Sequence, residues 1–347
     1  MKKLLIEKLV RENVLKMDSY ASARDEFKQG ADDMIFLDAN ENPFETGLNR
    51  YPDPKQKPLK KVFSNLKSIA ENNIIFGNGS DELLDLLFRG FCEPNRDSVI
   101  TLPPTYGMYD VLANLNAVKN KEITLDSNFQ PAVSSMLNAV EKNTKIIFLC
   151  SPNNPTGNSF SEASIIEILN NFNGLVLIDE AYIDFSSKKS WLEKMVHYPN
   201  LVILQTVSKA YGMAGIRLGI LYADQKIISV LNKIKPPYNI NELTQQKALE
   251  RISDLENTKI EILKILESRL FLETEFAKIP FIQKIFRSDA NFILIKVDDA
   301  NKRYDQLIQK GIVVRNRSNQ QNCENCLRIT VGTAEENNKL IEIMNGL

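Results

Sequence analysis

Short apolar runs alternate with helix-like segments through the middle of the chain, and this alternation most limits the folds open to it. The runs lie between residues 98 and 223 and read "SVITLP", "KIIFLC", "GLVLID", "LVILQT" and "LGILYA". Such runs are typical of strands buried on both faces, and intervening helices favour a largely parallel sheet. After "GNGSDE", the helical spacing of Leu83, Leu84, Leu87, Phe88 and Phe91 predicts a flanking helix. We therefore expect an α/β domain with helices on both faces of its sheet.

The length of 347 residues exceeds the usual size of a single core, so we expect the chain to divide. Residues 1–45 predict an N-terminal arm, and residues 46–240 predict the large domain with a mostly parallel sheet. A long helical stretch from about Asn241 to Lys278 opens a small domain, residues 241–347. There, "NFILIKV", "GIVVR" and "LRITVG" predict strands before a last helix, which makes the small domain α+β.

Composition argues against several classes of protein. The formal net charge of −1 leaves no electrostatic footprint for nucleic acid or an acidic membrane. The start, "MKKLLIEKLVREN", has charges after a short apolar patch and no small-residue cleavage site, which indicates a helix and not a signal peptide. No apolar run approaches the roughly 18 residues that a membrane span needs. We expect a cytoplasmic protein that binds small molecules.

The cysteines and the single histidine limit the possible chemistry further. His197 is the only histidine, which nearly excludes histidine-based triads and multi-histidine metal sites. Four scattered cysteines, Cys92, Cys150, Cys323 and Cys326, do not make a disulfide framework. The pair in "CENC" has redox or metal spacing, but without a second pair the favoured interpretation is a reduced turn before the strand "CLRITV". We expect no metal.

Polar motifs follow three of the predicted strands at the point where each strand ends. "KIIFLC" is followed by "SPNNPTG", "GLVLID" by "EAY" and "LVILQT" by "VSK". In open α/β sheets, ligands bind beyond the carboxyl ends of the strands. Asn154, Asp179, Tyr182, Ser208 and Lys209 could therefore line one pocket, although "SPNNPTG" could also be an ordinary turn.

The segment "TVSKAYGMAGIRLG", residues 206–219, places Lys209 and Arg217 in an otherwise small or apolar run. Arg217, with Thr206 and Ser208, could bind a dianion together with the helix start in "FGNGSDE", where backbone N–H groups and the helix dipole favour phosphate. That motif alone is weak, because acids such as Asp81 are also ordinary in a first helical turn.

Lys209 requires a different explanation from Arg217. Desolvation in an apolar pocket lowers the pKa of a lysine and makes its amine a nucleophile toward carbonyls. A phosphate site, a pocket lysine and the strand-end carboxylate of Asp179 together suit pyridoxal 5'-phosphate, whose ring nitrogen needs a carboxylate partner. Tyr182 and Asn154 could hydrogen-bond the ring hydroxyl, and Tyr106 of "PPTYGMY" could stack on the ring.

The ordered motifs "YPDP", "GNGSDE", "PPTYGMY", "SPNNPTG", "DEAY", "SKAYGMAGIRLG" and "LRITVG" resemble the fold-type I aminotransferases, and within them the histidinol-phosphate aminotransferases. The resemblance extends from "SYASAR" to "LRITVG". It implies Lys209 as the Schiff-base lysine, Asp179 at the pyridinium nitrogen, Tyr182 and Asn154 at the ring oxygen, and Tyr106 over the ring. It implies phosphate contacts from Ser80, Asp81, Thr206, Ser208 and Arg217, and from Tyr51 to the phosphate of the neighbouring subunit of a homodimer with shared sites.

Substrate binding rests on fewer residues. The resemblance implies that Arg328 holds the carboxylate of the amino-acid substrate, that Arg315 meets the substrate phosphate, and that Tyr20 of the arm closes over the substrate. Arg315 and Arg317 could instead be solvent-facing charges at a strand end. Only "FETGLN" separates "NENP" from "RYPDP", a shorter segment than in many relatives.

The implied reaction is transamination between L-histidinol phosphate and 2-oxoglutarate in histidine biosynthesis. An aromatic or broad-range aminotransferase and a threonine-phosphate decarboxylase share the scaffold, and fold alone does not separate them. A cofactor-binding transcription regulator is a poorer alternative, because about 35 residues precede the core motifs and no basic module is present.

Overall fold

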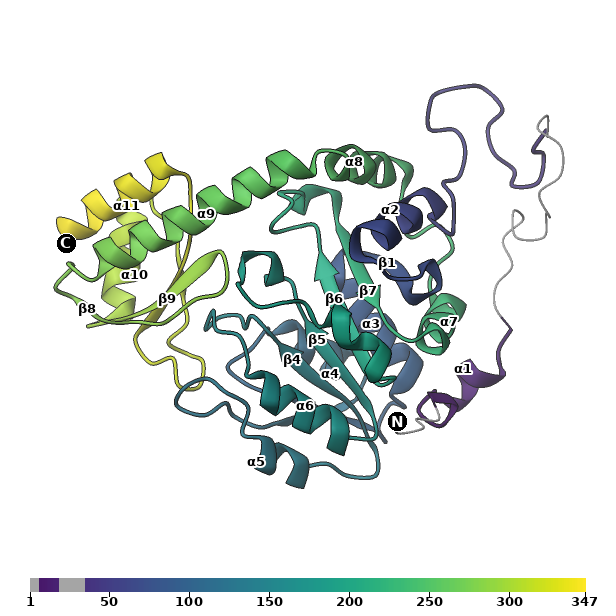
Figure 1. Ribbon diagram of the computed structural model, residues 1–347, viewed down its shortest axis with the longest axis horizontal. Coiled ribbons are helices and arrows are strands. Elements are labelled where there is room, and N and C mark those ends of the chain that lie inside the picture. Colours follow the sequence, from purple (N-terminus) through teal and green to yellow (C-terminus); the bar gives the residue numbers. More distant parts are fainter. Residues whose placement is uncertain (1–5, 19–34) are drawn as a thin grey trace.

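The structure, a computed structural model, describes residues 6–18 and 35–347. These residues form two lobes, each built on its own sheet (Figure 1). Helix α9, Leu255–Phe276, runs from the large lobe to the small lobe. No helix in the described part of the chain is long and apolar enough to cross a membrane.

The large sheet has, within the described residues, seven strands in the order β1-β7-β6-β5-β4-β2-β3. The pairs among β3, β2, β4, β5 and β6 are parallel, whereas β7 pairs antiparallel with both β6 and β1. Only residues 207–217 connect β6 to β7, too few for the crossover that a parallel strand requires. The strands are β1 Ile74–Asn78, β2 Ser98–Thr101, β3 Lys119–Glu122, β4 Thr144–Cys150, β5 Leu175–Asp179, β6 Leu201–Thr206 and β7 Leu218–Tyr222.

Helices cover both faces of this sheet, as the apolar runs predict. Along β4, Ile146 and Phe148 face one core, whereas Ile147 and Leu149 face the other, so both faces of the strand are buried. The first core includes residues of α1 Glu12–Lys16, α3 Gly79–Phe91, α4 Met108–Leu115 and α7 Gln225–Ile234. The other includes residues of α2 Lys57–Lys67, α5 Val133–Asn138, α6 Glu162–Asn171 and α8 Glu242–Ile252.

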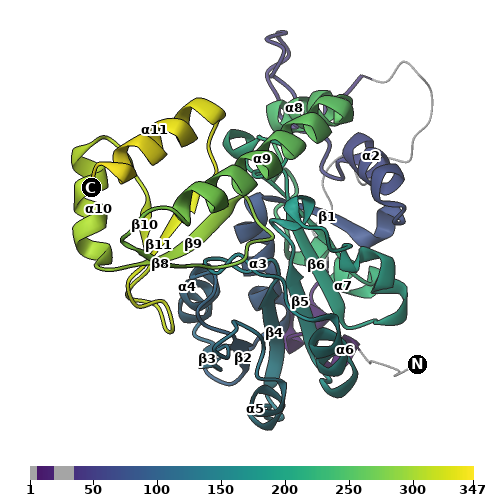
Figure 2. The same cartoon turned by 60° about the vertical axis from the view of Figure 1, so that its left-hand side comes forward.

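The small lobe is an antiparallel sheet in the order β10-β11-β9-β8, with helices on one face (Figure 2). Along β9, Ile293 and Ile295 pack into the core of the small lobe, whereas Phe292 and Leu294 join the core shared with the large lobe. The other face of this sheet therefore points toward the large lobe. Its elements are β8 Ile282–Ile285, β9 Phe292–Val297, β10 Arg315–Asn316, β11 Cys326–Thr330, α10 Ala300–Gln309 and α11 Ala334–Asn345.

Several local predictions are wrong in detail. The helical stretch from Asn241 is two helices, because α8 ends before Ser253, whose hydroxyl donates to the Glu250 carbonyl. Most of "GIVVR" is not a strand, since only Arg315–Asn316 pairs with β11. The buried residues of α8 pack into the core of the large lobe. The domain boundary near residue 241 stays a prediction.

Candidate active site

A cavity of about 110 Å³ lies at the carboxyl ends of the central parallel strands. It brings together ten of the eleven residues that the sequence predicts for the site in this lobe, all except Tyr51, and it adds Cys150 and Ala181. The ten are Ser80, Asp81, Tyr106, Asn154, Asp179, Tyr182, Thr206, Ser208, Lys209 and Arg217. Strands β4, β5 and β6 are neighbours in the sheet, which is why residues far apart in sequence converge here.

Asp179 is the buried carboxylate at the end of β5. Its Oδ2 accepts a hydrogen bond from the Tyr109 hydroxyl at 2.7 Å, and its Oδ1 accepts one from the Ala181 N–H at 3.1 Å. Burial raises the pKa of the Asp179 carboxyl to about 6, although the bond from Tyr109 acts in the opposite direction. Two donors therefore hold the carboxylate in place at the base of the cavity.

Tyr109 is a functional candidate that the sequence reasoning did not find. Tyr109 is fully buried in α4, and its ring stacks on that of Phe148 with centroids 5.0 Å apart. Its surroundings are therefore those of a core residue. Its place in the motif "PPTYGMY", three residues after Tyr106, was the available signal, because the turn from Tyr106 leads directly into α4 and brings the two side chains together. The two tyrosine rings meet edge to face, with centroids 5.6 Å apart.

The start of α3 and the segment after β6 form the other end of the cavity. The Gly79 N–H donates to the Arg217 carbonyl at 2.8 Å, which brings the helix start beside Arg217. The Thr206 hydroxyl lies 2.9 Å from that of Ser208. Asp81 accepts a bond of 3.0 Å from the Tyr106 hydroxyl and lies 3.9 Å from the Arg217 guanidinium.

Lys209 lines the cavity between these two ends and is an exposed residue overall, so the neighbouring groups desolvate its amine only in part. Burial lowers the pKa of the Lys209 amine, and the positive charges of Arg328 and Arg217 act in the same direction. Its Nζ lies 5.8 Å from the centre of the Tyr182 ring. A lowered pKa increases the neutral fraction of the amine, which is the nucleophilic form.

The residues predicted to bind substrate are less uniformly placed. Arg328 reaches from β11 to donate to the Asn154 side-chain oxygen, and its guanidinium lies 5.1 Å from the Phe292 ring centre. Arg315 is exposed, opposite Arg328 in the β10–β11 pair. Tyr51 does not line the cavity and stacks on Tyr238, with centroids 4.4 Å apart. Tyr20 lies outside the described residues.

The donor set and the close backbone packing suit pyridoxal 5'-phosphate. An added Cβ at Gly79, whose φ is +74°, would lie 2.5 Å from Arg217 Nη2, and one at Gly219 would lie 2.5 Å from the Ser80 nitrogen. The two glycines thus let the start of α3 approach the chain beside Arg217. The first N–H groups of a helix have no intrahelical acceptor and can bind a phosphate. At the other end, Asp179 offers the carboxylate that a protonated ring nitrogen needs.

Residues 15–344 match the class I and II aminotransferase family. The chain belongs to this family. The resemblance noted from the motifs is thereby confirmed: the protein is an aminotransferase of fold type I, and pyridoxal 5'-phosphate is the cofactor of the family.

Relatives and solved structures add detail to the family assignment. The chain is 62% identical over 342 residues to the histidinol-phosphate aminotransferase of Flavobacterium psychrophilum, covering 99% of both chains. The crystal structure of the histidinol-phosphate aminotransferase from Clostridium acetobutylicum matches with a TM-score of 0.80 at 24% identity, over 86% of this chain and 91% of that one. The L-threonine-O-3-phosphate decarboxylase from Porphyromonas gingivalis matches with a TM-score of 0.74 at 18% identity, over 86% of this chain and 90% of that one. The two structural matches show the fold and do not distinguish between these reactions.

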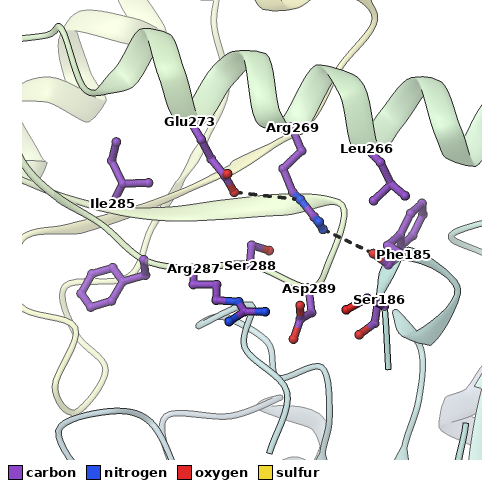
Figure 3. A pocket seen from close by; sticks show the side chains of 11 residues that line it. Phe185, Ser186, Leu266, Arg269, Glu273, Ile285, Arg287, Ser288 and Asp289 are labelled. Atoms are coloured by element: carbon purple, nitrogen blue, oxygen red, sulfur yellow. Dashed lines mark hydrogen bonds and ion pairs between the residues drawn. The ribbon is translucent and has the colours of Figure 1, made fainter. Parts of the chain in front are cut away.

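A larger cleft of about 620 Å³ lies where the two lobes meet (Figure 3). Arg269 of α9 crosses it and donates to the carbonyls of Ala290, at 2.7 Å, and Phe185, at 3.5 Å. Glu273 lies 4.0 Å from Arg269 on the same helix. The cleft lacks the lysine and strand-end carboxylate of the smaller cavity, and we interpret it as a joint between the lobes.

Proposed function

We propose that this protein transfers the amino group of L-histidinol phosphate to 2-oxoglutarate. The products are 3-(imidazol-4-yl)-2-oxopropyl phosphate and L-glutamate, and the step belongs to L-histidine biosynthesis. The observation that carries the proposal is the 62% identity over 99% of both chains to a histidinol-phosphate aminotransferase. The cavity supports it, because it combines a lysine, a buried carboxylate and a candidate phosphate site.

Lys209 is the proposed catalytic base and the covalent attachment point of the cofactor. When bound, pyridoxal 5'-phosphate supplies an electron sink for the negative charge that develops at the substrate carbon. Once the incoming substrate amine has displaced it, the free Lys209 amine would take the proton from that carbon and would return a proton on the other side of the substrate nitrogen. Its lowered pKa suits this role, because the amine has to be neutral to accept a proton.

Asp179 is proposed to hold a proton on the ring nitrogen. The Tyr109 hydroxyl and the Ala181 N–H fix both carboxylate oxygens, so the negative charge has a defined position. In this proposal Tyr182 and Asn154 bind the ring oxygen and Tyr106 covers the ring. Ser80, Asp81, Thr206, Ser208 and Arg217 surround the phosphate, the first two mainly through their backbone N–H groups.

Arg328, Arg315 and Tyr20 are proposed to bind the substrates. A guanidinium presents two parallel N–H donors, which match the oxygens of both a carboxylate and a phosphate. Arg328 is already directed at the cavity, because it contacts Asn154, which lines it.

We further propose a cytoplasmic homodimer in which Tyr51 of one subunit reaches the cofactor phosphate of the other. Residues 35–51 extend away from the lobes (Figure 1), and Ile35, Leu37 and Phe44 in this segment are 84%, 88% and 76% exposed. Apolar exposure of this extent is typical of a surface that a partner covers. The exposed position of Tyr51, away from the cavity of its own chain, is consistent with this arrangement.

The test is an assay of the purified protein loaded with cofactor, with 2-oxoglutarate present and three donors compared. We expect glutamate to form fastest from L-histidinol phosphate. Faster turnover of phenylalanine would favour an aromatic or broad-range aminotransferase instead. Release of carbon dioxide from threonine phosphate without glutamate would favour a decarboxylase. Salt-sensitive DNA binding without turnover of any amine would favour a regulator.

A further inference from the structure

The hairpin of residues 315–328, named here the anion hairpin, contains an unusual concentration of unpaired polar atoms. Across residues 6–18 and 35–347, five buried side-chain nitrogen or oxygen atoms have no hydrogen-bond partner, and four of them belong to this hairpin. The four are Arg317 Nε, Ser318 Oγ, Gln320 Oε1 and Arg328 Nε. Buried polar groups are normally paired, so these exceptions in one hairpin indicate a place for a ligand. The two arginine nitrogens and the Ser318 hydroxyl can donate to an anion, whereas Gln320 Oε1 is an acceptor.

Strand geometry determines which face of the sheet carries the arginines. Arg315 lies opposite Arg328, and the Arg317 N–H donates to the Cys326 carbonyl at 2.8 Å, which extends the pairing by two residues. Side chains alternate along a strand, so Arg315, Arg317 and Arg328 share one face. Arg328 also lies opposite Leu294, which packs toward the large lobe. The shared face is therefore the one turned toward the cavity.

The charges on this face are not balanced. In the described part of the chain, no carboxylate forms an ion pair with any of the three arginines. Burial and the positive charges of Arg328 and Arg315 lower the pKa of Arg317 to about 10. Burial also lowers the pKa of Arg328. A cluster of partly desolvated cations is unfavourable by itself and becomes favourable when an anion binds.

Arg317 and Arg315 differ in their surroundings. Arg315 is exposed, whereas Arg317 is half-buried, and its charge is close enough to influence the hydroxyl of Tyr182, a residue of the cavity wall. The alternative taken from the sequence, a solvent-facing charge at a strand end, therefore describes Arg317 poorly.

We infer that Arg317 is a second anion-binding arginine of the substrate site, which acts beside Arg328 on the non-reacting anionic group of each substrate. The inference rests on the proposed function, in which the first substrate carries a phosphate and the second carries two carboxylates. One subsite has to accept both kinds of anion in turn. Guanidinium groups can do so, because their donors match carboxylate and phosphate oxygens alike.

Binding to the cofactor-loaded enzyme tests this without turnover. The probes are glutarate, a dicarboxylate without a reactive carbonyl, and inorganic phosphate, each titrated by calorimetry. Arg317→Gln should raise the Kd for both probes by about 10- to 100-fold, the range for losing a charged hydrogen bond. The matched control is Arg287→Gln, which removes an exposed arginine of the same lobe and should leave both values unchanged. Cofactor absorbance and the Tm should match those of the wild type in both variants.

Steady-state kinetics provide the second readout. Arg317→Gln should raise the KM for both L-histidinol phosphate and 2-oxoglutarate more than it lowers kcat, and Arg317→Lys should recover part of the loss. Anion affinities within twofold of the wild type in Arg317→Gln would overturn the inference. If Arg317→Gln does not fold, the Kd values of Arg317→Lys provide the test. Lysine lacks the two parallel donors of a guanidinium, so wild-type affinity for both probes in Arg317→Lys would also overturn the inference. Anion binding that depends on Arg317 in an enzyme inactive on histidinol phosphate would reject the proposed function and leave this inference standing.

Discussion

The two sides of the cavity are built differently. On the large-lobe wall, meaning the cavity-lining residues of the large lobe, Asp179 accepts two hydrogen bonds and Asp81 accepts one from Tyr106. Within the described residues, none of the unpaired buried polar atoms belongs to this wall. The anion hairpin, by contrast, has four such atoms and three arginines for which no acidic partner is found among residues 6–18 and 35–347.

The difference matches what each side would bind. The cofactor is a permanent ligand, so its site can be held rigid by protein contacts before it arrives. Substrates are exchanged twice in each catalytic cycle, and a permanent acidic partner for the arginines would compete with them. The comparison therefore predicts that changes on the large-lobe wall affect the cofactor and the chemistry, whereas changes on the anion hairpin affect substrate affinity.

The largest expected effect is that of Lys209→Ala. Turnover should fall by about 10⁴-fold or more, because the variant loses both the attachment point and the proton carrier. The visible absorbance that depends on the lysine linkage should disappear, although cofactor could still bind through the phosphate site. An unchanged spectrum would show that another residue holds the cofactor.

Asp179→Asn should change how stability depends on pH in the cofactor-free protein. Because burial raises the pKa of this carboxyl to about 6, the folded state binds more protons than the unfolded state between about pH 4 and pH 6. The contribution of Asp179 to the free energy of unfolding therefore falls, by about 3 kcal/mol in total, as pH rises through this range. Relative to the wild type, Asp179→Asn should gain about that much stability from pH 4 to pH 7.

Urea unfolding of both proteins at several pH values measures this gain. The difference between them isolates Asp179, because all other groups titrate in both proteins. A difference that does not vary with pH would mean that the carboxyl is not desolvated in the folded chain.

Tyr109→Phe tests the residue that supports Asp179. Loss of the 2.7 Å hydrogen bond should raise the pKa of Asp179 further, so the acidic limb of the kcat/KM profile should move to higher pH by about one unit. Tyr222→Phe is the matched control, since the Tyr222 hydroxyl is buried without a hydrogen-bond partner in the described structure. If both variants shift the profile equally, Tyr109 has no specific effect on Asp179.

Gly79→Ala should have the smallest effect of the series, confined to cofactor affinity and stability. The positive φ disfavours alanine by about 1–2 kcal/mol, and the new Cβ would displace the Arg217 guanidinium. Gly311→Ala is the control, because Gly311 has a φ of +81° with open space around it. Both variants should lose stability, but only Gly79→Ala should weaken cofactor binding, as measured by the Kd. Equal cofactor affinity in the two variants would argue against a role for the Gly79 backbone.

The sequence predicts the large-lobe wall well because its residues follow strands that are apolar on both faces. Such strands are recognisable, and their carboxyl ends have to meet at one edge of the sheet, as Asn154, Asp179 and Lys209 do. The edge strands β3 and β8 are not predicted from the sequence, because many of their residues are polar and they are partly exposed. Nothing in their composition separates them from loops.

The anion hairpin is harder to predict from sequence. Strand β10 has only two residues, so "GIVVR" gives no reliable alternation from which to assign faces. The burial of Arg317 depends on the pairing of its backbone with Cys326 and on how the small lobe meets the large lobe. Both are tertiary features. Tyr109 is not predicted as a site residue for a different reason, because in the sequence it cannot be distinguished from an aromatic residue of the hydrophobic core.

The most direct test of the proposed reaction is to separate its two halves. Cofactor-loaded enzyme mixed with L-histidinol phosphate alone should lose its visible absorbance in a single turnover. Subsequent addition of 2-oxoglutarate should restore the absorbance and release one glutamate per active site. An absorbance that does not respond to L-histidinol phosphate, but responds to phenylalanine or threonine phosphate, would contradict the proposed function.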